Sequence, residues 1–212
     1  MIPHSEIPQE IKSILLKTLD AFYFLVILFI LLTTSSFAQG IKLGIGGGIS
    51  AISNSNSGLS NNSGYHLSAK AKLDIPLFPI KPVVFIQYYV LDGNYGFTTP
   101  LISYSGSTTQ KIFSFGFGGE FELIPGPISP YLALDFGYNN IGEIHYDPAI
   151  LDQFSYPAVS RTGIDIGVGT EIKIPLLFSL DISAKYNMLN LFGKPAGEGS
   201  INAVNLNLSV IF

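Results

Sequence analysis

Eight segments of the chain alternate apolar side chains with polar or small ones, and this repetition constrains the fold more than any other feature. Successive side chains of a β-strand point to opposite faces, so each segment has one strongly apolar face. The clearest segment is 109–123, in which phenylalanines alternate with serine, glycine and glutamate. The pattern predicts an all-β, antiparallel protein with strands over residues 40–52, 65–75, 83–92, 109–123, 131–139, 161–174, 178–188 and 203–212.

The connections between these segments alternate strictly between long and short. Proline follows the second, fourth and sixth segments at the same position, as Pro76, Pro125 and Pro175. Proline cannot donate to a strand ladder, so each one ends its strand. The long connections are polar or glycine-rich, and cover residues 53–64, 93–108, 140–160 and the segment before the last strand. Short turns at one end and long loops at the other are typical of barrels that cross an outer membrane.

The N-terminus has the pattern of an export signal. An apolar run over residues 21–32 follows Lys12 and Lys17, and Ser36 and Ala38 provide the small residues of a cleavage site. A transmembrane helix needs roughly 20 apolar residues, so the run is too short to span but suits a signal peptide. We predict a signal peptide over residues 1–38, cleaved before Gln39, and one barrel domain over 39–212.

Three acidic residues within the predicted signal peptide, residues 1–38, depart from the usual composition of an export signal. Glu6, Glu10 and Asp20 accompany the two lysines, which leaves open a later true start or an uncleaved anchor. Residues 1–38 thus carry a net charge of −1, so the rest of the chain carries −3 of the total −4. That charge excludes a strongly basic nucleic-acid surface.

Two further properties of the composition narrow the class of protein. The chain has no cysteine, which excludes disulfides and thiolate metal sites although export would permit them. Only 12% of its residues are charged, whereas a soluble domain carries about twice that fraction. The sparse charge favours a chain whose apolar face meets lipid.

The last strand ends on an aromatic residue. Val204, Leu206, Leu208, Val210 and Phe212 fall on one face, and the other face carries Ala203, Asn205, Asn207 and Ser209. A strand of this kind at a chain end would invite aggregation unless it closes a sheet. Because it ends on phenylalanine, this strand resembles the C-terminal strand that the barrel-assembly machinery of bacterial outer membranes recognises.

Over residues 40–212 these features resemble the small eight-stranded outer-membrane β-barrel family that includes OmpX-like, OmpA-transmembrane-type and PorT-like proteins. The resemblance implies an eight-stranded, antiparallel, up-and-down transmembrane β-barrel in the bacterial outer membrane, with both barrel termini periplasmic. In lipid every backbone polar group must be paired internally, and a closed sheet achieves this. The alternative is a soluble lipocalin-type barrel, whose apolar faces would point inward.

In the membrane version, the polar face of each strand lines the lumen. We predict that seven acidic and six basic residues point inward and pair there, because an eight-stranded barrel is only just wide enough for side chains. They are Lys42, Lys70, Lys72, Asp74, Glu120, Glu122, Asp135, Arg161, Asp165, Glu171, Lys173, Asp181 and Lys185. The functional alternative is a narrow ion pathway. Outward aromatic girdles are expected from Tyr65, Tyr88, Tyr89, Tyr131, Tyr138, Tyr186 and Phe212.

Three sets of residues are candidates for chemical sites. The glycines of residues 44–48 lack the final glycine of a dinucleotide fingerprint, which here is Ile49, so they are expected to line the barrel. Glu143, His145 and Asp147 alternate in a long loop and can ligate a divalent cation if extended, but a solvated loop is the favoured interpretation.

The third set consists of His66, near the start of the second predicted strand, and two serines close to it in the sequence. His66 can in principle activate Ser63 or Ser68, although no motif supports either pairing. We therefore predict that the protein is not an enzyme and has no catalytic, cofactor or metal residues.

The long loops are the remaining functional surface. They carry apolar residues of the kind that mark contact surfaces or extend strands above a membrane: Tyr95, Phe97, Leu101, Ile102, Tyr104, Ile141, Ile144, Tyr146, Ile150, Phe154 and Tyr156. The predicted role is structural or interactive, in envelope integrity or surface contact. The predicted partners are outer-membrane lipid, lipopolysaccharide, the barrel-assembly machinery and surface or secretion-system proteins. Alternatives are a narrow channel, a binder of small hydrophobic ligands, or a PorT-like accessory to protein secretion.

Overall fold

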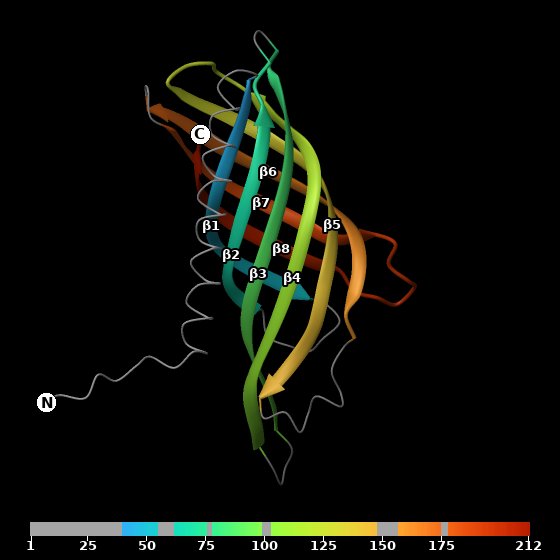
Figure 1. Ribbon diagram of the computed structural model, residues 1–212. Helices are drawn as coiled ribbons and strands as arrows, with labels where there is room; N and C mark the ends of the chain where they lie inside the picture. The colour runs from blue at the N-terminus through green and yellow to red at the C-terminus, as the bar shows by residue number, and fades with distance from the viewer. Residues whose placement is uncertain (1–39, 55–61, 76–77, 99–102, 148–156, 175–177) are drawn as a thin grey trace, which may run out of the picture. The chain divides into compact units, whose positions relative to one another are not determined.

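Eight antiparallel strands close into a barrel in the computed structural model (Figure 1). The structure describes residues 40–54, 62–75, 78–98, 103–147, 157–174 and 178–212, and Gly40–Phe212 form one compact unit. The strands are β1 (Ile41–Asn54), β2 (Asn62–Leu73), β3 (Ile80–Thr98), β4 (Ser103–Glu122), β5 (Ile128–Asp147), β6 (Val159–Ile174), β7 (Phe178–Phe192) and β8 (Ile201–Ile211). Each strand pairs with the next in the chain, which confirms the predicted up-and-down topology. The predicted signal peptide lies outside the described residues.

The first and last strands complete the closure. β1 pairs antiparallel with β8 from Gly44 opposite Ile211 to Asn54 opposite Ile201. At the end of this seam, Phe212 donates to the carbonyl of Leu43 at 2.8 Å, and Leu43 donates to the carbonyl of Phe212 at 3.1 Å. The terminal strand therefore closes the sheet as its sequence predicts, and the barrel has no free edge along the seam.

Glycines allow the wall to pack closely at this seam. A Cβ atom added to Gly48 of β1 would collide with the carbonyl oxygen of Leu206 on β8. Gly48 also lies directly between His66 of β2 and Asn207 of β8 in the ladder. Because Gly48 has no side chain, the side chains of His66 and Asn207 can contact each other across it inside the lumen.

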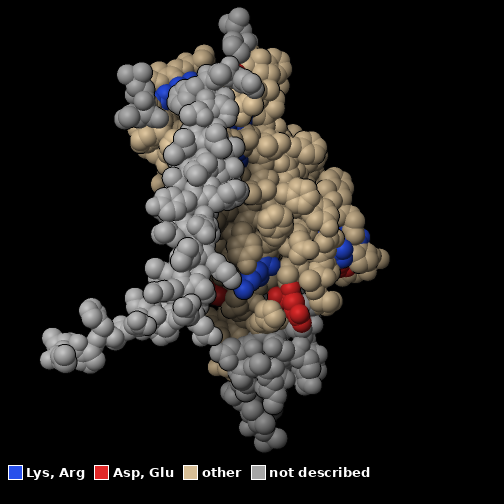
Figure 2. Space-filling view, viewed as in Figure 1, with Lys and Arg blue, Asp and Glu red and all other residues tan. Residues whose placement is uncertain are grey.

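The outer wall is apolar around the barrel. Outward positions include Ile49 and Phe117, each 63% exposed, and Leu206, which is 50% exposed. In Figure 2 most of the visible wall is tan, and the larger groups of charged residues lie toward the ends of the barrel. An apolar exterior around a polar interior inverts the soluble arrangement and is what a lipid environment requires. Among the described residues, no helix is both long and apolar enough to cross a bilayer.

Four of the tyrosines expected in outward girdles face outward, and two do not. Tyr65, Tyr88, Tyr138 and Tyr186 are 41–54% exposed on the outer wall. Tyr89 is fully buried and Tyr131 is 3% exposed, so the prediction was wrong for both. Tyr89 follows an outward residue directly, and Tyr131 shares the inward phase of Asp135, so strand alternation turns both into the lumen.

Three neighbouring strands extend well past the others at the end of the long loops. β3, β4 and β5 have 19, 20 and 20 residues, whereas β8 has 11. Most of the predicted loop 93–108 and the first part of the predicted loop 140–160 are therefore strand, because the β3–β4 and β4–β5 pairs continue. β2 pairs with β3 only as far as Asp92, and β6 pairs with β5 only as far as Ile141. The extension is defined here as the protruding sheet: residues 93–98, 103–111 and 142–147.

The apolar residues expected in the long loops fall into three groups by their position in the structure. Ile141 and Ile144 are each 2% exposed and lie on β5, so they are core residues. Tyr95, Phe97, Tyr104 and Tyr146 belong to strands of the protruding sheet. Leu101, Ile102, Ile150, Phe154 and Tyr156 lie outside the described residues.

Candidate functional site in the barrel lumen

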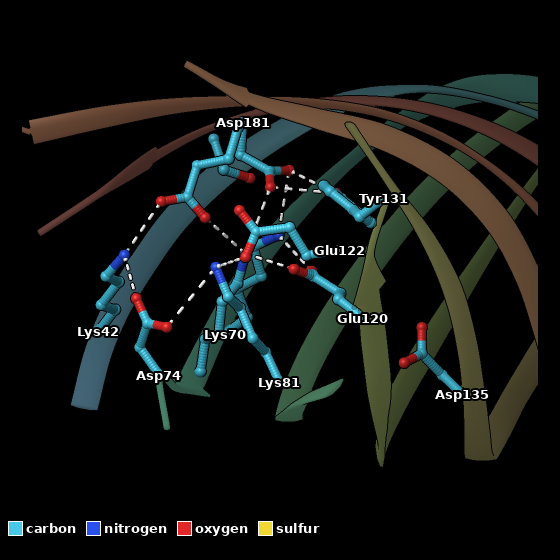
Figure 3. A network of polar contacts seen from close by, with 12 residues as sticks. Lys42, Lys70, Asp74, Lys81, Glu120, Glu122, Tyr131, Asp135 and Asp181 are labelled. Atoms are coloured by element: carbon cyan, nitrogen blue, oxygen red, sulfur yellow. Dashed lines mark hydrogen bonds and ion pairs between the residues drawn. The ribbon is translucent and has the colours of Figure 1, made fainter. Parts of the chain in front are cut away.

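The lumen has a charged half and a second half in which an apolar cluster packs beside uncharged polar side chains. The charged half lies at the end of the short turns, where inward side chains from seven strands form the network of Figure 3. The second half lies toward the protruding sheet. Both halves follow from which residues occupy the inward phase of each strand.

Lys72 of β2 is the centre of the charged half. Its Nζ atom contacts a carboxylate oxygen of Glu120, lies 3.0 Å from Glu171 and lies 3.7 Å from Asp181. It also lies 5.3 Å from the ring centroid of Tyr131. Since Lys72 is 1% exposed, its desolvation must be offset by these neighbours.

Lys70 and Tyr131 also bind carboxylates that Lys72 contacts. Lys70 lies 3.2 Å from Glu120 and 3.0 Å from Asp181. The Tyr131 hydroxyl donates to the Asp181 carboxylate, with both oxygens at 3.0 Å. Each of these two buried acids therefore has more than one donor, which is the condition under which buried charge is tolerated.

The mouth of the barrel at the short-turn end carries a second group of ion pairs. Lys42 lies 2.7 Å from Asp74, and both are only partly buried. Lys81 lies 2.8 Å from Glu122 and 3.6 Å from Asp74. Lys81 is absent from the predicted inward set, because the third strand was predicted to begin at residue 83. Lys81 shares the inward phase of Gln87, so a predicted strand that began two residues earlier would have included it. The predicted inward set would then have held seven basic residues instead of six.

Midway along the lumen a separate pair joins β7 to β5. Lys185 lies 2.6 Å from Asp135, which stands apart from the other labelled residues in Figure 3. The lysine stem crosses Gly167 of β6, where an added Cβ would lie 2.6 Å from the Lys185 Cγ atom. Asp165 is 5% exposed and lies opposite Asp135 in the β5–β6 ladder.

An uncharged network lies beside this pair and contains the only histidine predicted inside the barrel. Ser50 Oγ lies 2.8 Å from His66 Nδ1, and Asn207 Oδ1 lies 3.2 Å from His66 Nε2. The amide oxygen of Asn207 accepts from Nε2–H, so Nδ1 accepts from the Ser50 hydroxyl. The predicted inward facing of His66 is confirmed, but its partner is Ser50 rather than Ser63 or Ser68.

A serine hydrogen-bonded to a histidine that a third polar group orients is also the arrangement that activates the nucleophile of serine hydrolases. Ser50 is 4% exposed and His66 is 1% exposed. Ser68 donates to Asn207 at 3.0 Å and therefore shares the acceptor of the histidine. This burial favours a structural network that ties β1, β2 and β8 together.

The half of the lumen toward the protruding sheet holds a cluster of apolar side chains. Its members are 0–7% exposed and come from six strands: Ile52, Tyr89, Leu91, Ile112, Ile141, Leu189, Ile201 and Ala203. Uncharged polar side chains are buried beside this cluster: Asn62, Gln110, Asn139, Asn190 and Asn205. The expectation of a polar interior therefore holds only in part for this half, because apolar and uncharged polar side chains share it. A cavity of ≈ 10 Å³ lies in the charged half beside Lys81, Glu120 and Tyr131, and has room for about one water molecule.

An ion pair links β6 to the connection between β7 and β8. Arg161 Nη2 lies 2.5 Å from Glu198 Oε2, and Asn190 Nδ2 donates to the other oxygen at 2.8 Å. Arg161, predicted to pair in the lumen, thus binds the loop carboxylate. The hydrogen bond and charge of the guanidinium lower the pKa of Glu198.

The candidate metal-site residues do not converge within the described part of the chain. Glu143 and His145 occupy exposed positions of β5, and the side chain of Asp147 lies outside the described residues. The described residues contain no cluster of three or more His, Cys, Asp or Glu side chains suited to a metal ion. The glycines of residues 44–48 lie within β1, as expected for the barrel wall.

Comparison with known proteins agrees with this architecture. Residues 24–212 match the family described as the outer membrane protein beta-barrel domain. A closed antiparallel barrel with an apolar exterior and a charged interior defines an integral outer-membrane protein. The chain belongs to the outer membrane protein beta-barrel domain family and is located in the bacterial outer membrane.

Several solved structures are similar to the chain. The attachment invasion locus protein Ail of Yersinia pestis, solved with the heparin analogue sucrose octasulfate, is 18% identical, with 82% of this chain and 99% of Ail covered and a TM-score of 0.43. A major outer membrane protein of Thermus thermophilus is 12% identical over 81% of this chain and 99% of that chain, with a TM-score of 0.49. The N-terminal barrel domain of Pseudomonas aeruginosa OprF is 12% identical over 82% and 98%, with a TM-score of 0.41. No curated protein matches the chain.

Proposed function

We propose that the protein is a non-enzymatic outer-membrane barrel that supports the envelope and contacts a partner at the cell surface. The observation that carries the proposal is the protruding sheet. Short turns of outer-membrane barrels face the periplasm and longer connections face outward, so this sheet projects from the cell. The barrel termini Gly40 and Phe212 then lie on the periplasmic side, as predicted.

Each outer strand of the protruding sheet has only β4 as its ladder neighbour in the described part of the chain. Residues 95–98 of β3 and residues 144–147 of β5 pair with β4 and with no other described strand. Unpaired N–H and C=O groups on an edge are a template for an extended segment of another molecule. We infer that surface contact is made at these edges, on a barrel held rigid by its lumen.

The lumen supports a structural role over the channel and small-ligand alternatives. Ion pairs cross the charged half, and the other half is occupied by the apolar cluster and by uncharged polar side chains, all at most 7% exposed. An eight-stranded barrel has an interior only just wide enough for side chains. Reconstitution into planar bilayers should therefore give no stepwise conductance, whereas steady conductance steps would favour the narrow channel.

Photo-cross-linking on intact cells tests the surface role. A benzophenone amino acid replaces Ser105 or His145, which are exposed on the protruding sheet, and in a matched control replaces lipid-facing Leu132. We expect discrete protein or lipopolysaccharide adducts at the first two positions and only phospholipid adducts at Leu132. Identical adducts at all three positions would contradict the proposal. Adducts to secretion-system proteins would identify a PorT-like accessory instead.

We also infer that residues 1–38 are a signal peptide that is removed on export. The apolar run of residues 21–32 and the small residues Ser36 and Ala38 support this inference. N-terminal sequencing of protein from isolated outer membranes should begin at Gln39. A sequence that begins at Met1 would indicate an uncleaved anchor.

A further inference from the structure

The turns at the periplasmic end of the barrel have an unusual surface for segments that face water. Between Ile75 and Ile80, and again between Leu123 and Ile128, the chain carries no charged residue. Their described apolar side chains are open to the surroundings: Phe78 is 49% exposed, Leu123 48% and Ile124 63%. Turns that are surrounded by water are usually built from polar residues together with glycine and proline.

Charged residues next to these turns point inward rather than outward. Asp74 follows β2 directly and lies 2.7 Å from Lys42, while Glu122 ends β4 and lies 2.8 Å from Lys81. At this level the barrel is therefore charged inside and apolar outside. Water outside the wall would favour the opposite distribution, because exposed charge is well solvated and exposed apolar area is not.

The β4–β5 turn continues the lipid-facing wall of β4. On β4 every outward position from Phe113 to Phe121 is phenylalanine or glycine, and Leu123 follows in the same phase. Ten residues of a strand tilted by about 40° rise about 25 Å, which is the height of the apolar band of an outer-membrane barrel. Ile124 and Phe78 lie beyond Leu123 and Ile80, so the apolar surface is longer than the hydrocarbon layer.

We propose that the β4–β5 turn and the described residues Phe78 and Pro79 before β3 are embedded in the headgroup region of the periplasmic phospholipid leaflet, with Phe78 and Ile124 against the first acyl methylenes. The lipid surface is the occupant because the turns are continuous with the wall that lipid already covers. The charged mouth formed by Lys42 and Asp74 then opens at headgroup level. The inference rests on the outer-membrane location and on the orientation given under the proposed function, with the short turns toward the periplasm, and is independent of any surface partner.

Spin labelling at single cysteines tests the depth of the turns, since the chain has no cysteine of its own. The variants are Phe78→Cys and Ile124→Cys, with Phe117→Cys as a mid-bilayer control and Ser105→Cys as a water-exposed control. Each nitroxide-labelled protein is reconstituted in phospholipid vesicles and shown to be folded by its faster unboiled gel band. Collision rates with oxygen and with nickel-EDDA then report lipid and water accessibility.

We expect nickel-EDDA collision rates at positions 78 and 124 to be several-fold below the rate at Ser105, and oxygen rates between those of the two controls. Nickel-EDDA rates equal to the rate at Ser105 would overturn the proposal. The measurement is repeated in native outer-membrane vesicles. Protection from nickel-EDDA that appears only there would also overturn it, because a protein partner rather than lipid would then cover the turns.

Discussion

The Nζ atom of Lys72 lies 3.0 Å from Oε2 of Glu171, although neither side chain is more than 2% exposed. The same ammonium group also contacts Glu120 and lies 3.7 Å from Asp181. One buried cation therefore contacts three buried carboxylates from three strands, which Lys70 and Lys42 also contact. A group of this kind adds little net stability while intact, but removal of one member leaves uncompensated charge.

Replacement of Lys72 by methionine should destabilise the barrel strongly. Breaking a buried ion pair from one side costs about 3–5 kcal/mol, and three acids lose a partner here. The measurement is the free energy of unfolding in urea with the protein in lipid vesicles. Lys194→Met is the matched control, because Lys194 is exposed in the β7–β8 connection and surface substitutions change stability by about 0.5 kcal/mol or less. Equal stability of both variants would contradict the central role of Lys72.

A double-mutant cycle should show that Asp135 and Lys185 act as a pair. Their charged atoms are 2.6 Å apart inside the lumen. We expect Asp135→Asn and Lys185→Gln each to lower the free energy of unfolding, and the double variant to cost less than their sum. The expected coupling is within about 0.5–3 kcal/mol, the range for residues in one ion-pair network. Strict additivity would mean that the two side chains do not interact in solution.

The Arg161–Glu198 pair should make the β7–β8 connection sensitive to acid. The hydrogen bond from Arg161 lowers the pKa of Glu198 below its usual 4.5. A carboxyl whose folded pKa is depressed stabilises above its unfolded pKa, and this contribution is lost as the pH falls through the folded pKa. A carbon-13 NMR titration of the Glu198 carboxyl should give a value below 4.5, and Arg161→Gln should raise it toward that value. A titration unchanged by Arg161→Gln would show that the pair does not form.

Substitution of Gly48 should interfere with closure of the barrel. A Cβ atom there would collide with the carbonyl oxygen of Leu206 on the β1–β8 seam. We expect Gly48→Val to reduce the fraction of protein that folds into vesicles, measured as the heat-modifiable fraction on gels. Ala51→Val is the matched control, since Ala51 lies on the same strand at an exposed position. Equal folding of both variants would show that the seam has more room than the structure gives it.

Much of the fold was predictable because strand periodicity and turn chemistry are local properties. The alternation around Phe113 and Phe115 identified both a strand and its outward face. The facing of His66 and the inward phase of the thirteen predicted charges followed in the same way. Arg161 differs in its partner alone, because Glu198 belongs to a connection rather than to a strand.

The contacts within the lumen were not predictable, because they depend on which residues the closed sheet brings to one level. Ser50 meets His66 across the β1–β2 ladder, and no local pattern distinguishes it from Ser63 or Ser68. Ile52 and Leu91 share the inward phase with polar residues of their strands, and only closure gathers them into an apolar cluster. The protruding sheet depends likewise on pairing between β3, β4 and β5, which loop composition does not reveal.

The most direct test of the account is the gel mobility of the protein from isolated outer membranes, with and without boiling. A closed membrane barrel resists SDS until it is heated, so we predict a compact, faster band in the unboiled sample that slows on boiling. Identical mobility in both samples, together with recovery of the protein in the soluble periplasmic fraction, would contradict the account. The apolar faces would then line the interior of a soluble, lipocalin-type barrel.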